Sequence, residues 1–388
     1  FLSTAREIIY LWVARMVMAG YEFLGKCPFD TVYMHATVLD TQGRRMSKSL
    51  GNGIDPRDMI EQYGADAVRF TLMILTTEGQ DVKLAPTKFE LGRNFMNKIW
   101  NAARYVLQSV PEEAYDAEPG TELTDRWILS RGNAAVAAVS DALEHYRYHD
   151  AAQAVYKFVW DDFCDWYLEA SKDRIAAKDI SCGATLVTSL RLLVRLIQPL
   201  TPYIASELAA ELGETDSAAV LPWPEAGQRD SEAEALMQRL QAVIRAVRRL
   251  RNENRVGERE PLDARIKTDD PAPLAAQRDL ICQLARLGSL EAGPDVERPK
   301  AGATEVLAKD EVYVSLEGLI DVEAEIGRKE KELVKAEAFL QSIEGKLSNA
   351  NFVDRAKPEV VARERERADE ARERIARLEH AIHALRGE

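Results

Sequence analysis

The chain is poor in the residues that build metal centres and disulfide frameworks. Its 388 residues include four cysteines and five histidines, and no two cysteines form a C-x-x-C pair. Cysteines this few and this far apart indicate free, mostly buried thiols in a reducing compartment, which excludes disulfide-rich and zinc-finger classes of protein. His145 and His149 lie four residues apart, but no third ligand is near them in the sequence, so we predict no metal site. His380 and His383 have no such ligand either.

Long hydrophobic runs and an excess of basic charge are also missing. No stretch of 18 or more residues is wholly apolar, because Arg15 interrupts the apolar segment near the start. We therefore expect neither a membrane span nor a signal peptide. The chain has 51 basic and 64 acidic side chains, a formal net charge of −13. A nucleic-acid partner would consequently need a local basic surface.

Helical periodicity dominates what is present, and the predicted fold class is mainly α. Apolar residues recur at helical spacing over 4–24, whereas the β-branched and aromatic residues of 31–40 predict a buried strand. This order of helix, strand and glycine-containing loop is typical of the end of an α/β unit. Helical segments separated by Pro and Gly breaks predict a bundle over 88–212 and a further helix over 231–254. We expect the aromatic residues around Trp160 to be core, with base stacking as the alternative.

The last part of the chain has a different pattern. Residues 262–318 are rich in proline, with short β-like segments, and indicate either a small α/β module or a loosely packed connector. From Leu319 onward apolar residues alternate at spacings of three and four, interrupted only by Lys329 in the first of two such stretches. Pro358 lies between the stretches, so we predict an antiparallel coiled-coil hairpin. Core packing in a larger bundle is the alternative.

One polar loop carries the residues best suited to chemistry. The segment QGRRMSKSLGNGIDP (42–56) places Lys48 between two serines, with glycines that allow the backbone to reorganise. A mobile lysine flanked by hydroxyls suits a group that approaches a phosphate and donates positive charge where negative charge develops. Arg45 adds a second cation with a forked geometry. Asp55 and Pro56 have the residue types of a helix cap and a first helical position.

A local basic surface is found within the helix predicted over 231–254 and just beyond it. Residues 239–255 contain six arginines and one glutamate, a local charge of +5. Arg245, Arg248 and Arg249 share one face at helical spacing, and apolar residues occupy the opposite face. From the pattern alone, phosphate contacts and a merely solvated helix face are equally good explanations.

These segments together resemble a known family. RMSKS followed by LGNGIDP resembles the KMSKS signature of class I aminoacyl-tRNA synthetases, with Arg45 in place of the first lysine of the signature. AREIIYLWVARMVMAG, KCPFDTVYMHATVLD, YGADAVRFTL, NFMNKIWNAARYVL and FVWDDFCDWYLEASK resemble the valyl branch of the Val/Ile/Leu group. SLEGLIDVEAEIGRKEKELVKA and KLSNANFVDRAKPEVV resemble a C-terminal arm peculiar to that branch. TARE (4–7) and PYIASEL (202–208) depart from the pattern of the relatives.

The resemblance implies an ATP-dependent ligase that attaches valine to its tRNA, with ATP, Mg²⁺ and valine as small-molecule partners. Lys48 would be the catalytic residue, and the ATP-binding loop would comprise Arg45, Met46, Ser47, Lys48 and Ser49. Ile8, Ile9 and Trp12 would border the amino-acid pocket, although as a bare helix pattern they indicate core. The tRNA contacts would include Arg245, Arg248, Arg249, Arg363, Arg367 and Arg374, because the bundle of the family grips the anticodon stem and loop and the arm touches the outer corner of the tRNA.

The implied domains are the end of a Rossmann-like catalytic domain (1–56), connecting helices (57–118), an anticodon-binding bundle (119–256), a small α/β connector (257–317) and a coiled-coil arm (318–388). No H-x-G-H signature is present, so we expect the other half of the catalytic domain and the editing domain upstream of Phe1. On that expectation the isolated chain would not catalyse valine-dependent ATP–pyrophosphate exchange. We expect a cytoplasmic monomer. An isoleucyl or leucyl enzyme and a noncatalytic tRNA-binding protein remain the alternatives.

Overall fold

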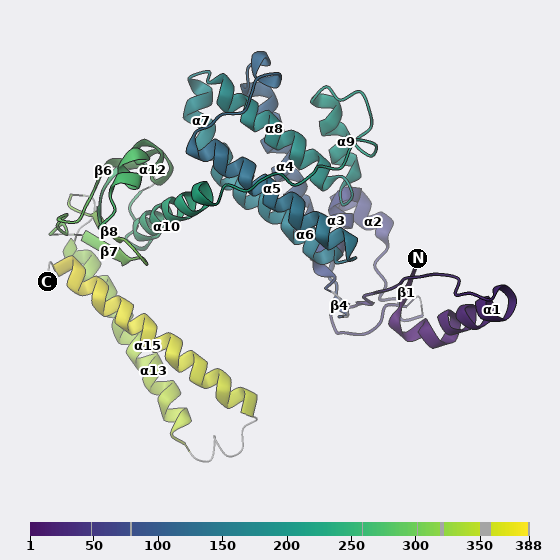
Figure 1. Cartoon of the computed structure of the whole chain (residues 1–388). Coiled ribbons are helices and arrows are strands. Elements are labelled where there is room, and N and C mark those ends of the chain that lie inside the picture. Colours follow the sequence, from purple (N-terminus) through teal and green to yellow (C-terminus); the bar gives the residue numbers. More distant parts are fainter. Residues whose placement is uncertain are drawn as a thin grey trace. The chain divides into compact units, whose positions relative to one another are not determined.

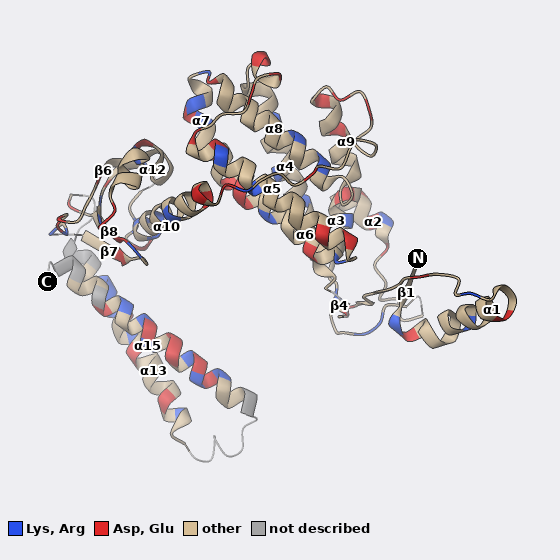
Figure 2. Ribbon diagram, in the orientation of Figure 1, with Lys and Arg blue, Asp and Glu red and all other residues tan. Residues whose placement is uncertain are grey.

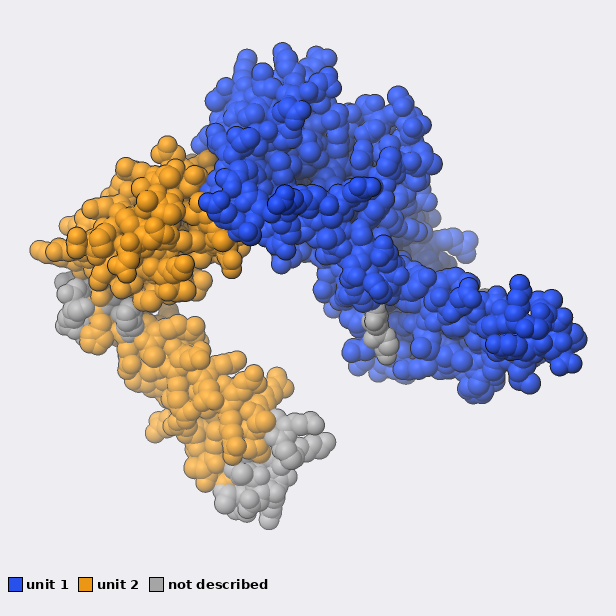
Figure 3. All heavy atoms as spheres, in the orientation of Figure 1, with its two compact units in different colours: residues 1–234 blue, residues 235–388 orange. Residues whose placement is uncertain are grey.

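The computed structural model describes residues 1–47, 49–77, 80–257, 259–300, 302–318, 322–349 and 358–386. The chain forms two compact units, residues 1–234 and residues 235–388 (Figure 3). Helices make up most of both units, and the sheets are small (Figure 1). The prediction of a mainly α fold is therefore confirmed.

The first unit begins with two short parallel pairs of strands. β1 (Leu2–Ala5) pairs with β2 (Val32–His35), and β3 (Val38–Leu39) pairs with β4 (Val82–Lys83). Between β1 and β2 the chain is helical, with a 3₁₀ turn (Arg6–Ile8), a π-helical turn (Ile9–Val13) and α1 (Ala14–Leu24). The helix predicted over 4–24 thus starts only after β1.

The prediction of one buried strand over 31–40 is wrong in two respects. The segment forms two strands, β2 and β3, and it is not buried: the side chain of Met34 is 50% exposed. The physical reason is that β2 has β1 as its only neighbour among the described strands, so one edge and much of its surface remain uncovered. Ile8 and Ile9 are half-buried and Trp12 is exposed, so the core interpretation of these three residues is wrong as well.

The rest of the first unit is a helical bundle. Its helices are α2 (Pro56–Tyr63), α3 (Ala65–Leu75), α4 (Phe89–Ser109), α5 (Leu123–Glu144), α6 (Tyr148–Tyr156), α7 (Leu168–Ala176), α8 (Ile180–Ile197) and α9 (Pro202–Glu211). Short 3₁₀ turns (Pro86–Lys88 and Glu112–Tyr115) flank α4, and π-helical turns (Lys157–Tyr167) join α6 to α7. α8 is long and apolar enough to cross a membrane by length and composition, but it is mostly buried as the central helix of the bundle.

The aromatic segment within the π-helical turns is core, as predicted. Phe163, Trp166 and Tyr167 are buried. Trp160 is half-buried and stacks on Tyr156, with 5.4 Å between the ring centroids.

Two side chains of α3 hold the corner between α8 and α9. The buried Asp66 carboxylate accepts hydrogen bonds from the backbone amides of Tyr203 (3.4 Å) and Ile204 (2.7 Å), so it supplies the cap of α9. Burial raises the pKa of this carboxyl. One turn further on, the Arg69 guanidinium donates to the backbone carbonyls of Pro199 and Leu200, both at 3.2 Å. Free amides at a helix start and free carbonyls at a helix end are thereby satisfied together.

The second unit combines a mixed sheet with helices. The boundary between the units falls within α10 (Ser231–Glu253). The sheet has the strand order β6-β5-β8-β7, in which β5 is parallel to β6 and antiparallel to β8. Its strands are β5 (Leu262–Lys267), β6 (Leu287–Gly293), β7 (Gly302–Val306) and β8 (Glu311–Ser315), and α11 (Ala272–Ala276) and α12 (Arg278–Ala285) lie between β5 and β6. Of the two alternatives for 262–318, the small α/β module is confirmed.

Two long helices complete the second unit. α13 (Val322–Leu347) packs against α15 (Pro358–Arg386), and the two run antiparallel (Figure 1). The side chains of Ala336 and Ile343 on α13 and of Ala368 and Ala371 on α15 are buried, so the apolar stripes form the seam between the helices. The predicted pairing of two helices is confirmed, and we call α13 and α15 together the arm.

Candidate functional site

The polar loop after β3 starts with a tight turn. The amide of Asp40 donates to the carbonyl of Arg44 at 2.8 Å, and the amide of Gly43 donates back to the carbonyl of Asp40 at 2.9 Å. Gly43 has a φ of +80°, a backbone conformation that costs glycine little and other residues more. The turn brings Arg45 into an antiparallel bridge with Leu39. The candidate phosphate-binding loop is therefore tied to the end of a strand.

The Asp40 carboxylate is the centre of this turn. It is 7% exposed and accepts hydrogen bonds from the amide of Gln42 (3.0 Å), from the amide and Nε of Arg44 (both 2.8 Å) and from Nδ2 of Asn52 (2.9 Å). The hydrogen bond from Asn52, followed by those from Arg44, holds the pKa of Asp40 well below its usual range. These hydrogen bonds thus favour the charged form of the carboxylate.

Asn52 joins the two ends of the loop. Its Nδ2 donates to Asp40 and also to the carbonyl of Arg45 (3.2 Å), while its Oδ1 accepts the amide of Ser47 at 2.9 Å. The backbone on either side of Met46 is therefore fixed by one side chain, which lies six residues further along the chain. Gly51, with a φ of +62°, allows the return of the chain to Asn52.

The predicted ATP-binding residues divide into anchors and exposed groups. Met46 is half-buried and packs against the core cluster that contains Met59 and Tyr63. The hydroxyls of Ser47 and Ser49 are 3.2 Å apart, and Arg45 and Ser49 are exposed. Lys48, the predicted catalytic residue, lies outside the described residues. The loop therefore presents hydroxyls and one guanidinium on both sides of the position of Lys48 in the chain, a donor set that suits a phosphate.

The helix start predicted after the loop is confirmed. The Asp55 carboxylate accepts the amide of Arg57 at 2.8 Å, and Pro56 is the first residue of α2. The loop is consequently anchored at both ends, by β3 before it and by a capped helix after it.

The predicted amino-acid pocket residues lie on the helical turns after β1. Nε1 of Trp12 donates to Oγ1 of Thr4 at 2.9 Å, which fixes the indole over β1. Oγ1 of Thr37 donates to Glu7 at 3.3 Å, so the acidic residue of TARE lies beside the start of β3, the strand that leads to the polar loop. The roles of Ile8, Ile9 and Trp12 stay predictions.

The arginines of the basic segment in and after α10 have different environments. Arg251 is buried and donates to backbone carbonyls that include those of Gly257 (2.9 Å) and Arg286 (2.7 Å). Arg239 pairs with Asp310 at 2.7 Å. Two of the six arginines therefore stabilise the fold of the second unit, and the local charge of +5 is not all available to a partner.

The three arginines predicted to contact tRNA from α10 are all exposed. Arg248 donates to the carbonyl of Leu284, at 2.7 Å from Nη2, and Arg249 pairs with Glu305 at 3.1 Å. These contacts hold two of the side chains against the second unit. The tRNA contact of Arg245, Arg248 and Arg249 stays a prediction.

The arm carries basic and acidic side chains along both helices (Figure 2). Arg367 donates to Glu364 at 2.7 Å, and its guanidinium lies 5.3 Å from the ring centroid of Phe339 across the seam. Arg363 and Arg374 are exposed. Arg367 therefore helps to join the two helices. The tRNA contacts of Arg363, Arg367 and Arg374 stay predictions.

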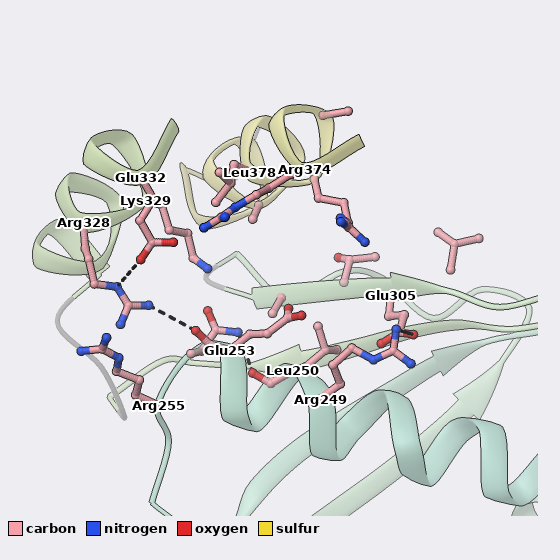
Figure 4. Close-up of a pocket in the computed structure, with 17 residues that line it drawn as sticks. Arg249, Leu250, Glu253, Arg255, Glu305, Arg328, Lys329, Glu332, Arg374 and Leu378 are labelled. Carbon is pink, nitrogen blue, oxygen red and sulfur yellow. Dashed lines mark hydrogen bonds and ion pairs between the residues drawn. The ribbon is translucent and has the colours of Figure 1, made fainter. Parts of the chain in front are cut away.

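A large cleft opens where the arm leaves the rest of the second unit, and we call it the arm-base cleft (Figure 4). Its volume is about 970 Å³, and its walls are the end of α10, β7 and the adjoining parts of α13 and α15. The charged residues that line it are Arg249, Glu253, Arg255, Glu305, Arg328, Lys329, Glu332, Arg374 and Arg377. The cleft was not predictable as a whole from the sequence, in which its one sign is Lys329, the residue that interrupts the apolar stripe.

The histidines form no metal centre in the part of the chain that the structure describes. Nδ1 of His145 is 2.8 Å from the carbonyl of Asp141, a contact within one helix end. Across the described residues, no three His, Cys, Asp or Glu side chains are grouped in a way that could hold a metal ion.

Three family models match the chain. Residues 1–85 match "tRNA synthetases class I (I, L, M and V)", residues 125–266 match "Anticodon-binding domain of tRNA ligase", and residues 321–386 match "Valyl tRNA synthetase tRNA binding arm". A valine–tRNA ligase of Thermotoga maritima is 40% identical over 99% of this chain, and one of Nitratidesulfovibrio vulgaris is 39% identical over 97%.

The chain is similar to valine–tRNA ligases over nearly its whole length. It spans 44% of the length of both of these relatives. Among solved structures, a Mycobacterium tuberculosis methionyl-tRNA synthetase in complex with methionyl-adenylate covers 53% of this chain, with 42% of its own length matched, at 21% identity and a TM-score of 0.47. The family resemblance drawn from the signature loop and the terminal arm is confirmed.

Sequence reasoning did not identify Asp40 and Asn52 as parts of the loop. Both are polar residues beside a signature, and the aspartate directly follows a strand, which is a position where functional side chains gather. Their joint role depends on the turn around Gly43, which the sequence pattern does not specify.

Proposed function

We propose that this chain is part of a valine–tRNA ligase, which uses ATP to activate valine and then transfers it to the 3′ end of tRNA(Val). The observation that carries the proposal is the loop itself: Asn52 fixes the backbone on both sides of Met46, and Arg45 and Ser49 remain exposed near Lys48 for a phosphate. The match of the terminal residues to a tRNA-binding arm of the valyl enzymes supports the choice of amino acid and of tRNA.

In this proposal the loop acts during attack of the valine carboxylate on the α-phosphate of ATP. Lys48 donates positive charge to the phosphate oxygens as negative charge builds up, and pyrophosphate leaves. Arg45, Ser47 and Ser49 donate further hydrogen bonds to the phosphates, and Met46 anchors the loop in the core. Mg²⁺ enters with ATP and neutralises its phosphates. Ile8, Ile9 and Trp12 border the valine side chain.

The remaining parts of the chain have tRNA-binding roles in this proposal. Residues 1–56 form the end of a Rossmann-like catalytic domain, and residues 119–256 bind the anticodon stem and loop. The α/β module of 257–317 connects the bundle to the arm of 318–388, which contacts the outer corner of the tRNA. In this proposal the protein is a monomer, and it is cytoplasmic because its substrates are those of translation.

The test is binding of the chain to valine tRNA and to isoleucine tRNA over a salt series. We expect tighter binding of the valine tRNA, with affinity that falls as salt rises because phosphate contacts release counterions. Equal affinity for both tRNAs would contradict a role of this chain in tRNA identity. A lack of binding to either tRNA would contradict the proposed function as a whole.

A further inference from the structure

The arm-base cleft combines cations from three separate parts of the second unit. Figure 4 shows Arg328 and Lys329 on the α13 side of the cleft, Arg374 on the α15 side, and Arg249 near the end of α10. Since these side chains come from segments far apart in the sequence, their convergence is a property of the fold rather than of one basic stretch.

The lining of the cleft is positively charged although the chain is acidic. It includes six cations (Arg249, Arg255, Arg328, Lys329, Arg374 and Arg377) and three anions (Glu253, Glu305 and Glu332), a formal charge of +3. The whole chain has a formal charge of −13. A concave, positively charged surface on a protein with a negative net charge concentrates the electric field of its charges and attracts an anionic partner.

The anions of the cleft engage only part of this positive charge. Arg249 pairs with Glu305 at 3.1 Å, and Arg328 lies 3.9 Å from Glu332 and donates to the carbonyl of Glu253 at 3.2 Å. The side chains of Arg255, Arg374 and Arg377 are exposed, and their guanidinium groups form no hydrogen bond or ion pair with any residue that the structure describes. Three guanidinium groups in the lining therefore remain available to a ligand.

Lys329 is a second and independent indication that the cleft binds an anion. It occupies a position of the three-four stripe at which the neighbouring positions, Ile326 and Leu333, are apolar, and it is only 7% exposed. A lysine in such a seam lowers stability relative to an apolar residue. Lys329 lines the same cleft as the three available arginines, so binding of an anion there would explain why a destabilising lysine occupies this position.

We propose that the arm-base cleft binds the sugar–phosphate backbone of tRNA, with Arg255, Arg374 and Arg377 as phosphate contacts and Lys329 as a fourth cation in the wall. The inference rests on the proposed function and adds a site at the base of the arm, formed jointly with α10 and β7. A volume of about 970 Å³ exceeds what one phosphate fills, so the cleft suits a run of backbone. Planar guanidinium groups match phosphate oxygens in a bidentate geometry.

The test compares tRNA binding by the full chain and by two charge-matched triple variants. The cleft variant is R255Q/R374Q/R377Q. The control is K267Q/K300Q/K309Q, which removes three exposed cations of the second unit that do not line the cleft. Dissociation constants for valine tRNA are measured from about 50 to 200 mM salt, the range in which phosphate contacts dominate the salt dependence.

We expect the cleft variant to bind about tenfold or more weakly at the low-salt end, with a log–log salt slope smaller by about two to three. The control should keep most of the affinity and slope of the wild-type chain. Equal losses of tRNA affinity in the two triple variants would show that the effect depends only on total charge, and would overturn the cleft site. If the wild-type chain bound no tRNA, the proposed function itself would be contradicted. That result differs from equal losses in the two variants, which would contradict the cleft site alone.

The Lys329→Met variant separates binding from folding. Methionine continues the apolar stripe, so the melting temperature of the arm should stay the same or rise. Affinity for tRNA should nonetheless fall about threefold or more with loss of one phosphate-facing cation. Unchanged affinity together with unchanged or raised stability would show that Lys329 has no part in the site.

Discussion

Asn52 and Asp40 form a hydrogen bond of 2.9 Å across the base of the signature loop, between Nδ2 of the amide and Oδ2 of the carboxylate. Through its other contacts the same amide fixes Arg45 and Ser47. The side-chain pair of Asp40 and Asn52 therefore determines the conformation of the loop. These two residues position Arg45 and Ser47, which would contact phosphate, but have no proposed phosphate contact of their own.

Replacement of Asn52 by alanine should release the loop without unfolding the chain. We expect the Ser47 amide to exchange its hydrogen at least about tenfold faster, because its acceptor is removed. The stability of the helical bundle should change little, since Asn52 lies outside it. Amide hydrogen exchange with residue resolution measures the first effect, and urea unfolding measures the second. Unaltered exchange at Ser47 would show that the loop is held by other contacts.

Glu234 should make the first unit sensitive to acid. Hydrogen bonds from Arg229 and, less strongly, from Ser130 lower the pKa of Glu234 to about 2. A carboxyl whose folded pKa is depressed contributes stability above its unfolded pKa and loses it as pH falls through the folded pKa. Glu234→Gln should therefore cost about 2 kcal/mol at pH 7, and its difference from wild type should disappear between about pH 4.5 and pH 2.

Tryptophan fluorescence in a urea titration measures this difference, because all six tryptophans lie in residues 1–234. The matched control is Glu232→Gln, whose side chain is 89% exposed. A pH-independent difference between wild type and Glu234→Gln would show that the carboxylate contributes through packing instead of charge.

Two glycine substitutions should have opposite effects. A Cβ at Gly92 would meet the carbonyl oxygen of Ala67 and lie 2.5 Å from Oγ1 of Thr71, so α3 and α4 would have to separate. Gly92→Ala should destabilise the first unit by about 1 to 3 kcal/mol. A Cβ at Gly345 in α13 meets no atom within 4 Å, so Gly345→Ala should stabilise the arm by about 0.5 to 1 kcal/mol.

Tryptophan fluorescence reports the first variant and thermal circular dichroism the second. Unchanged or raised stability of Gly92→Ala would contradict the close approach of α3 to α4, and a loss of stability in Gly345→Ala would contradict the open space beside Gly345.

The joint replacement of Arg245, Arg248 and Arg249 by glutamine should weaken tRNA binding and reduce its salt dependence. Because Arg248 and Arg249 also contact Leu284 and Glu305, the triple variant should lose stability as well. Arg245→Gln alone should flatten the log–log salt slope by about one. An unchanged slope in both variants would remove this helix face from the tRNA site.

The sequence predicted the structure where the interactions are local or repeat regularly along the chain. It did not where they join segments that are far apart in the chain. The pairing of α13 with α15 was predictable because a three-four apolar repeat has few other ways to be buried. The start of α2 was predictable because capping involves residues two apart. The burial of residues 31–40 was not, since it depends on how many strands lie beside β2. Nor could helical spacing distinguish the buried Arg251 from the exposed Arg245.

The clamp of Asp66 and Arg69 on the corner between α8 and α9 also has a consequence for folding kinetics. The hydrogen bond from Tyr203 to Asp66 spans 137 residues, so its formation closes a long stretch of chain and costs more entropy than a local contact. α9 cannot acquire its carboxylate cap until α3 has docked. A substitution that slows docking of α3 will therefore delay completion of a helix near the other end of the first unit, and refolding rates of Asp66 variants will report that dependence.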